Sequence, residues 1–195
     1  MKKSFGAKIL AFPAPVWCVG TFDRNGKPNV MTAAWAGICC SKPPCVNVSL
    51  RKATYTYGSL MGKKAFTVSI PSENYAGEAD FFGIASGRDV DKFEISGLTP
   101  VKSELVDAPY VNEFPLVMEC RVIHFHEIGL HTIFIGEILD VKITREVLSQ
   151  DTNLPDLLKL KPITFAPEIR TYHGLGEVLG HAFDLGMPLH LKNEA

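Results

Sequence analysis

Several features that define common protein classes are missing from this chain of 195 residues. No stretch reaches the roughly 18 uninterrupted apolar residues that a membrane-spanning helix requires. The 20 Lys and Arg residues are matched by 21 Asp and Glu residues, so the formal net charge is −1. Because no basic excess attracts nucleic acid or an anionic membrane, we expect neither as a partner.

The first residues superficially resemble a secretion signal, with two lysines before an apolar stretch. Lys8 interrupts that stretch, and Pro13 and Pro15 fall where a signal helix would run. The five cysteines include no C-x-x-C pair, and their odd number would leave at least one unpaired in an oxidising compartment. Adjacent Cys39 and Cys40 suit neither a disulfide scaffold nor a zinc site. We therefore expect a soluble cytoplasmic protein with reduced thiols.

The sequence also lacks the short motifs of several large enzyme classes. Neither the dinucleotide-binding pattern G-x-G-x-x-G nor the phosphate-binding pattern G-x-x-x-x-G-K-[ST] follows a predicted strand. The nucleophile motif G-x-S-x-G is absent as well. These absences argue against a Rossmann domain, a P-loop nucleotide site and an α/β-hydrolase.

What the chain does contain is a succession of strand-like patterns. Apolar runs and alternating segments predict strands over 16–22, 28–36, 45–51, 65–70, 115–126 and 131–143. A short helix is predicted over 53–61, ending at Gly62, where a left-handed residue can close it. Two further helices are predicted after Ser72 and over 175–185, the last ending at Gly186. Consecutive, hairpin-like strands with few helices favour a closed or partly closed antiparallel barrel. A doubly wound parallel sheet would need regular alternation of strands and helices.

Two polar segments, 29–35 and 49–56, suggest a binding site, and one face of the strand that leads into the second points the same way. In the strand over 45–51, Asn47, Ser49 and Arg51 share one face, which an ordinary core would not use. The stretch 49–56 combines an arginine, several hydroxyls and a helix start, which together suit a phosphate dianion. Small residues beside an amide, a hydroxyl and an indole over 29–35 would let a ligand approach the backbone. Each segment alone also fits a solvated strand edge.

Two further segments are less specific when taken alone. The charged stretch 86–93 fits a surface loop, and a lone histidine, His131, opens the strand over 131–143. His124 and His126 share a strand face, so a metal site with His131 is conceivable. No acidic residue is spaced as a fourth ligand, so we predict no metal.

Taken together and in this order, the four segments resemble the flavin reductase-like family with the FMN-binding split-barrel fold. The resemblance extends from about Pro15 to Gly186 and includes 129–137 and 172–177. It implies one domain over 1–195 with a core of about 15–186. The implied fold is mainly β with short helices, a six-stranded antiparallel Greek-key split barrel. The implied assembly is a homodimer with one non-covalently bound FMN per subunit near the interface.

The resemblance also assigns roles to individual residues. Those implied to line the flavin are Asn29, Thr32, Ala33, Ala34 and Trp35. Those implied to hold its phosphate end are Ser49, Arg51, Thr54 and Thr56. Further contacts are implied for Ser86, Lys92, His131 at the ring edge and Phe165 over the ring, with His131 the candidate catalytic residue. Leu130 stands where many relatives carry Asp, so the imidazole of His131 lacks a carboxylate that would favour its protonation.

Three functions remain open at this point. A carrier would keep FMN bound and pass electrons between redox protein partners, which is the function we favour. A reductase would take hydride from NAD(P)H, the alternative electron donor, and supply reduced FMN to a second enzyme. A non-redox barrel would bind a small anion and be colourless.

Overall fold

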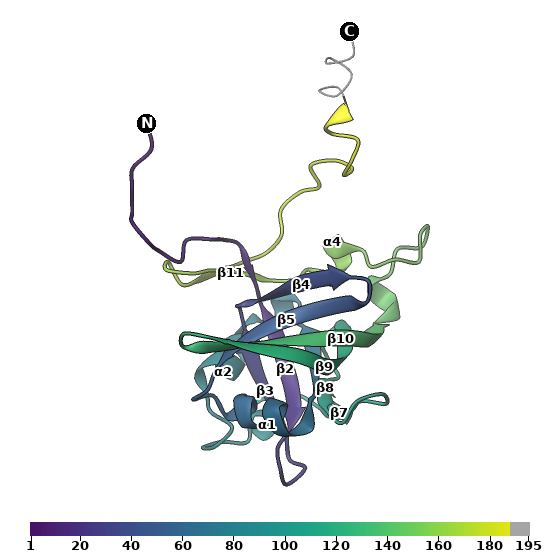
Figure 1. The fold of residues 1–195 in the computed structure, drawn as a ribbon. Helices are drawn as coiled ribbons and strands as arrows, with labels where there is room; N and C mark the ends of the chain where they lie inside the picture. Colours follow the sequence, from purple (N-terminus) through teal and green to yellow (C-terminus); the bar gives the residue numbers. More distant parts are fainter. Residues whose placement is uncertain (188–195) are drawn as a thin grey trace.

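The computed structural model describes residues 1–187 (Figure 1). Its centre is a seven-stranded sheet in which every pair of neighbouring strands is antiparallel. In spatial order the strands are β3 (Pro28–Ala33), β2 (Trp17–Phe22), β6 (Ala65–Ile70), β9 (Leu116–Ile128), β10 (His131–Ile143), β5 (Pro44–Arg51) and β4 (Ala36–Ser41). No helix among residues 1–187 is long and apolar enough to cross a membrane.

The predicted mainly β, antiparallel fold is confirmed, but the large sheet has seven strands where six were expected. The difference arises after Ala33, where the chain bends and begins a separate edge strand, β4. Smaller sheets that sequence patterns did not predict are β1–β11–β12, formed by Ala14–Pro15, Thr164–Ala166 and Thr171–His173, and β7–β8, formed by Pro100–Lys102 and Pro109–Val111.

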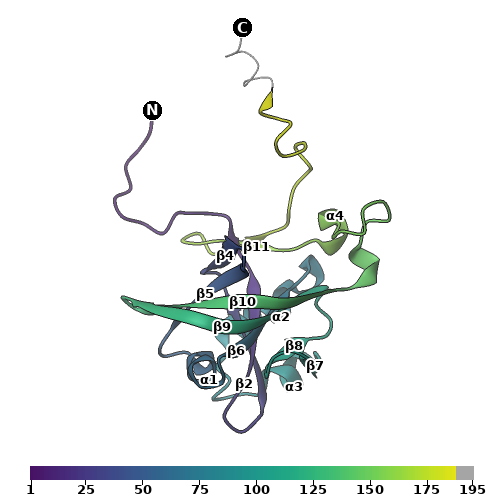
Figure 2. The same cartoon turned by 45° about the vertical axis from the view of Figure 1, so that its right-hand side comes forward.

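Within residues 1–187, four short α-helices lie around the sheet (Figure 2). They are α1 (Tyr55–Lys63), α2 (Ala76–Ile84), α3 (Lys92–Ser96) and α4 (Leu157–Leu160), with 3-10 turns at Glu73–Tyr75 and Arg145–Val147. The predicted end of α1 at Gly62 is wrong: the left-handed residue is Lys64, with a φ of 54°. Asp91 begins α3 by accepting hydrogen bonds from the N–H groups of Phe93 and Glu94.

The apolar core has two parts. Phe66 and Phe134 lie in the first, which fills the space enclosed by the large sheet and α1. Gly136 allows this packing, because a Cβ there would lie 2.4 Å from the ring of Phe66. The second part lies beneath α2, where Phe82 packs against Phe93 and Phe114. This second part fixes α2 and the loop after it relative to β3.

The helix predicted over 175–185 is not formed. Residues 174–181 have no regular structure, and turns follow over 182–186. Leu179 is 90% exposed and Phe183 is 95% exposed, so the apolar stripe that predicted the helix contacts no core. A helix of this length is marginal without packing of its apolar face. Both terminal segments leave the body on the same side (Figures 1 and 2).

Candidate functional site

A cavity of about 250 Å³ lies between β3, the start of α1 and the loop after α2. It is lined by five of the residues selected from the sequence: Asn29, Thr54, Thr56, Ser86 and Lys92. They come from three separate segments of the chain, namely β3, the start of α1 and the loop after α2. We call this space the inner cavity.

Asn29 carries the most informative atom of the inner cavity. Its side-chain nitrogen donates a 2.9 Å hydrogen bond to Thr56 Oγ1, while its Oδ1 has no partner among residues 1–187. The residue is only 4% exposed, and a buried acceptor without a donor is costly. Gly87 keeps this atom accessible, because a Cβ there would lie 2.2 Å from Oδ1. The site therefore suits a ligand with a hydroxyl or N–H donor.

The start of α1 presents the first N–H groups of the helix to an anion, whereas the donors of Thr54 are used within the protein. Thr54 precedes the helix, and both its N–H and its hydroxyl donate to the carbonyl of Arg51, at 3.0 and 2.9 Å. The first turn of α1 contains no acidic residue, so nothing opposes a negative charge there. Across the cavity, Ser86 Oγ accepts a hydrogen bond from the N–H of Arg88 at 3.2 Å. This arrangement fits a phosphate group.

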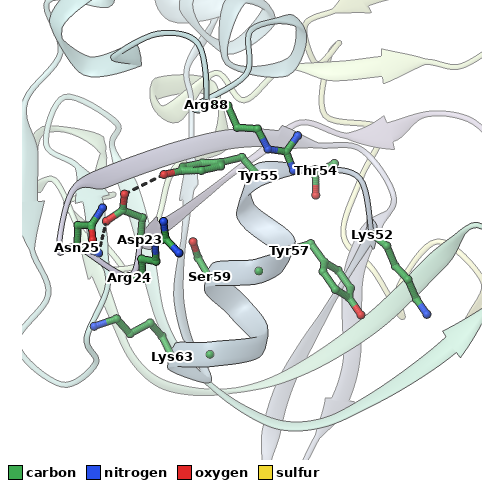
Figure 3. A pocket seen from close by; sticks show the side chains of 12 residues that line it. Asp23, Arg24, Asn25, Lys52, Thr54, Tyr55, Tyr57, Ser59, Lys63 and Arg88 are labelled. Carbon is green, nitrogen blue, oxygen red and sulfur yellow. Dashed lines mark hydrogen bonds between the residues drawn. The ribbon is translucent and has the colours of Figure 1, made fainter.

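Arg88 is a cavity residue that our selection from the sequence missed. Its guanidinium donates to the carbonyl of Ala53 at 3.1 Å and lies over the ring of Tyr55, 6.0 Å from the centroid. In the sequence it belongs to a charged stretch typical of a solvated loop. Only the contact of Arg88 with Tyr55, 33 residues earlier in the chain, distinguishes it from an ordinary residue of a solvated loop (Figure 3).

Lys92 is buried and occupies the floor of the inner cavity. Its ammonium donates to the carbonyls of Val30 at 2.8 Å and Phe82 at 2.7 Å, and so connects β3 to α2. Burial lowers the pKa of Lys92 to about 8. One of the three ammonium protons remains for a ligand. Burial also raises the pKa of the neighbouring Cys18 thiol to about 12, so that thiol is neutral.

A second cavity, of about 330 Å³, adjoins the first, since Gly83 and Ile84 line both. We call it the outer cavity. It contains three more of the residues selected from the sequence, namely Thr32, Ala34 and Phe165. The ring of Phe165 lies 5.4 Å from that of Tyr172, whose hydroxyl donates to Asp80 at 2.8 Å. Aromatic walls with small neighbours suit a flat ring system.

The remaining selected residues line neither cavity. They are Ala33, Trp35, Ser49, Arg51 and His131. Ala33 belongs to the core, and Trp35 offers its carbonyl to the N–H of Ser49 at 2.8 Å. Arg51 and His131 are directly paired across the β5–β10 ladder. Among residues 1–187, no three His, Cys, Asp or Glu side chains are grouped to hold a metal ion.

The fold and the paired cavities define a class of protein. The family model of the flavin reductase like domain matches residues 9–165, and the chain belongs to this family. The resemblance recognised in the four sequence segments is thereby confirmed, as is the split-barrel fold.

The particular likeness is to flavoredoxin. The chain is 56% identical to flavoredoxin of Desulfovibrio vulgaris (Miyazaki F), with a TM-score of 0.91 over 95% of this chain and 100% of that one. Flavoredoxin from Methanosarcina acetivorans is 27% identical, with a TM-score of 0.87 over 96% and 100% of the two chains. An uncharacterised protein of Archaeoglobus fulgidus is 36% identical over 115 residues, which span 59% of this chain and 65% of that one. The chain is a flavoredoxin-like flavoprotein.

Proposed function

We propose that this protein binds one FMN per subunit without a covalent bond and acts as an electron carrier. The observation that carries the proposal is the buried, unpaired Oδ1 of Asn29 beside the hydroxyls of Thr54 and Ser86. Whole-length identity of 56% to a flavoredoxin supports it. FMN combines a phosphate, a polar ribityl chain and a flat ring, and the inner and outer cavities offer matching surfaces.

Each part of the cofactor has candidate contacts in this chain. Ser86 and the first N–H groups of α1 would hold the phosphate, and the hydroxyl of Thr54 would join them on leaving the carbonyl of Arg51. Arg51 and Ser49 lie on the adjoining strand β5. Asn29 would accept a hydrogen bond from the ribityl chain or the ring edge. Bound FMN would supply reversible transfer of one or two electrons.

Two side chains would adjust this chemistry. Lys92 would place a positive charge near the cofactor, and a cation there favours the reduced, anionic form. His131, at the start of β10, would hold or donate a proton at the ring edge. Its neighbour Leu130 provides no carboxylate to pair with the imidazole.

We also propose that the protein acts as a homodimer. Ile38 on edge strand β4 is 81% exposed and Leu130 at the tip of the β9–β10 hairpin is 72% exposed. Exposed apolar residues also lie on both terminal segments. Large exposed apolar side chains gathered on several elements are typical of a subunit interface.

The second candidate is an NAD(P)H-dependent reductase that supplies reduced FMN, a function consistent with the family to which the chain belongs. An anaerobic experiment separates the two. The FMN-loaded protein is reduced chemically, passed through a desalting column and mixed with an oxidised redox protein. A carrier retains its flavin on the column and passes its electrons to the acceptor. Release of the reduced flavin, together with rapid NAD(P)H oxidation in the presence of free FMN, would instead identify a reductase.

A further inference from the structure

A group of three cysteines at the β4 edge of the large sheet has no role in the proposed function. Cys39 and Cys40 lie near the end of β4 and are exposed. Cys45 lies near the start of β5 and is only 2% exposed. A short turn at Lys42 and Pro43 joins the two strands, so the three cysteines belong to one hairpin. All of them are free thiols in this structure.

Two of these cysteines oppose each other directly across the hairpin. In the antiparallel ladder of β4 and β5, Cys40 is the partner of Cys45. Directly opposed residues of such a ladder have Cα atoms about 4.5–5.5 Å apart, and disulfides join Cα atoms about 4.4–6.8 Å apart. The side chains of an opposed pair also share one face of the sheet. The backbone therefore holds Cys40 and Cys45 at a separation that a disulfide can bridge.

A β-bulge produces this pairing. The register shifts after Ile38, the partner of Val46, and leaves Cys39 as the extra residue of β4. In a regular ladder Cys39 would take the place opposite Cys45. The bulge gives that place to Cys40 and turns its side chain away from the face of Ile38. A subunit interface that includes Ile38 therefore does not need to cover Cys40.

The surroundings of the two thiols give them different parts in an exchange reaction. Cys40 is exposed, so a small molecule in solution can reach it. Cys45 is covered, and burial first, then the adjacent thiol of Cys40, raises its pKa. Because the thiolate is the form that attacks, Cys45 is a slow nucleophile toward molecules in solution. It needs no access to solvent, however, to attack a sulfur that is already attached to Cys40.

We propose that Cys40 and Cys45 form a reversible thiol–disulfide exchange site whose substrate is a small disulfide. The thiolate of Cys40 attacks one sulfur of the small disulfide, and the other sulfur leaves as the first small thiol. Cys45 then attacks Sγ of Cys40, which joins the two cysteines and releases the second small thiol. The two protein thiols lose two electrons and two protons, and the small disulfide gains them as it becomes two thiols.

The position of the pair favours a reversible bond over a structural one. A disulfide here would close only the short loop of the β4–β5 turn, and stabilisation by a disulfide grows with loop length. Because Cys40 is exposed, an excess of small thiol can attack the bond again and reverse both steps. Exposed disulfides are typically the labile ones.

Peptide mapping of the folded protein after incubation with oxidised glutathione tests the proposal. Free thiols are blocked with N-ethylmaleimide, and the tryptic peptide that contains residues 39–45 is analysed by mass spectrometry. We expect this peptide to lose two hydrogen atoms, to carry no glutathione and to keep one blocked thiol, that of Cys39. Treatment with dithiothreitol before blocking should restore three blocked thiols.

Three variants identify the reacting sulfurs. Cys39→Ser is the matched control, because it removes the exposed cysteine that has no partner in β5, and it should form the disulfide as the wild type does. Cys40→Ser should lower the yield of the disulfide at least tenfold. Cys45→Ala should instead accumulate glutathione on Cys40, because the second step is lost. Circular dichroism checks that each variant is folded, and the two variants at exposed positions decide the matter if Cys45→Ala is not.

Several results would overturn the proposal. They are a wild-type yield of the disulfide in Cys40→Ser, its loss in folded Cys39→Ser, and a wild-type protein that carries glutathione but forms no disulfide. A disulfide between two chains, seen by non-reducing electrophoresis, as the main product would overturn it as well. None of the three cysteines lines the inner or the outer cavity, so these results are independent of flavin binding.

Discussion

At the scale of single residues, Asn29 connects the fold to the proposed chemistry. An acceptor that is buried without a donor costs about 1–3 kcal/mol, which the folded protein tolerates at a site where a ligand supplies the missing donor. The amide nitrogen of the same side chain is fixed by Thr56, so the free oxygen is held in one orientation. The residue is therefore preorganised for binding.

Replacing Asn29 with Leu should weaken FMN binding at least tenfold, because the buried, unpaired acceptor of the inner cavity is lost. The unfolding free energy of the flavin-free protein should change by less than about 1.5 kcal/mol, since one unpaired buried polar group is removed together with one hydrogen bond. Quenching of FMN fluorescence and urea denaturation measure the two effects. Asn112→Leu, at an exposed position, is the matched control. Undiminished FMN affinity would exclude Asn29 from the site.

Lys92 should make stability depend on pH. Its pKa is about 8 in the folded protein and 10.5 in a free side chain, because burial disfavours the charged form. Between these values the unfolded chain binds more protons, so this residue's contribution makes the unfolding free energy rise with pH, by up to about 1.4 kcal/mol per unit. Denaturation of the wild type and Lys92→Met at pH 7 to 10 checks this. The difference between the two proteins should grow with pH, and a constant difference would contradict the low pKa.

The same substitution bears on electron transfer. Lys92→Met removes a positive charge from the floor of the inner cavity. We expect the midpoint potential of bound FMN to fall, because the reduced flavin loses electrostatic stabilisation. Spectroelectrochemical titration measures it, and an unchanged potential would restrict Lys92 to connecting β3 and α2.

At the scale of elements, the loop after α2 controls the size of the inner cavity. Gly87→Ala would put a Cβ 2.2 Å from Asn29 Oδ1 and 2.7 Å from the Tyr55 ring, so the loop or these two side chains must shift and the shape of the inner cavity changes. We expect FMN affinity to drop at least tenfold in fluorescence titrations. Gly77→Ala in α2, where a Cβ meets nothing within 4 Å, should bind normally. Equal affinities would show that the loop does not shape the site.

The strands and helices also show which parts of the fold the sequence patterns predict and which they miss. Strand β6 follows the predicted bounds because its alternation is complete and Pro71 ends it. Edge strand β4 was missed because Ile38, Cys39 and Cys40 are all exposed and present no alternating face. The helix predicted over 175–185 failed for a related reason: its apolar stripe is real, but within residues 1–187 it contacts no core.

The site was predictable to a similar degree. The order of polar segments identified eight of the residues that line the inner and outer cavities. Arg88 was missed because its role depends on a tertiary contact with Tyr55.

At the scale of the whole molecule, the terminal segments leave large apolar side chains exposed to solvent. Phe5 is 62% exposed, Phe12 is 53% exposed, and both lie in a segment that extends away from the body. We expect the full chain to be a dimer by light scattering and deletion of residues 1–12 to weaken the dimer at least tenfold. A full chain that is monomeric at micromolar concentration would contradict the proposed assembly.

The most direct test of the account is the visible absorbance spectrum of the purified, desalted protein, with the released flavin identified and quantified after denaturation. We expect an oxidised flavin spectrum and about one FMN per chain. A colourless protein that regains no flavin spectrum after incubation with FMN, and that does not quench FMN fluorescence in solution, would contradict the account.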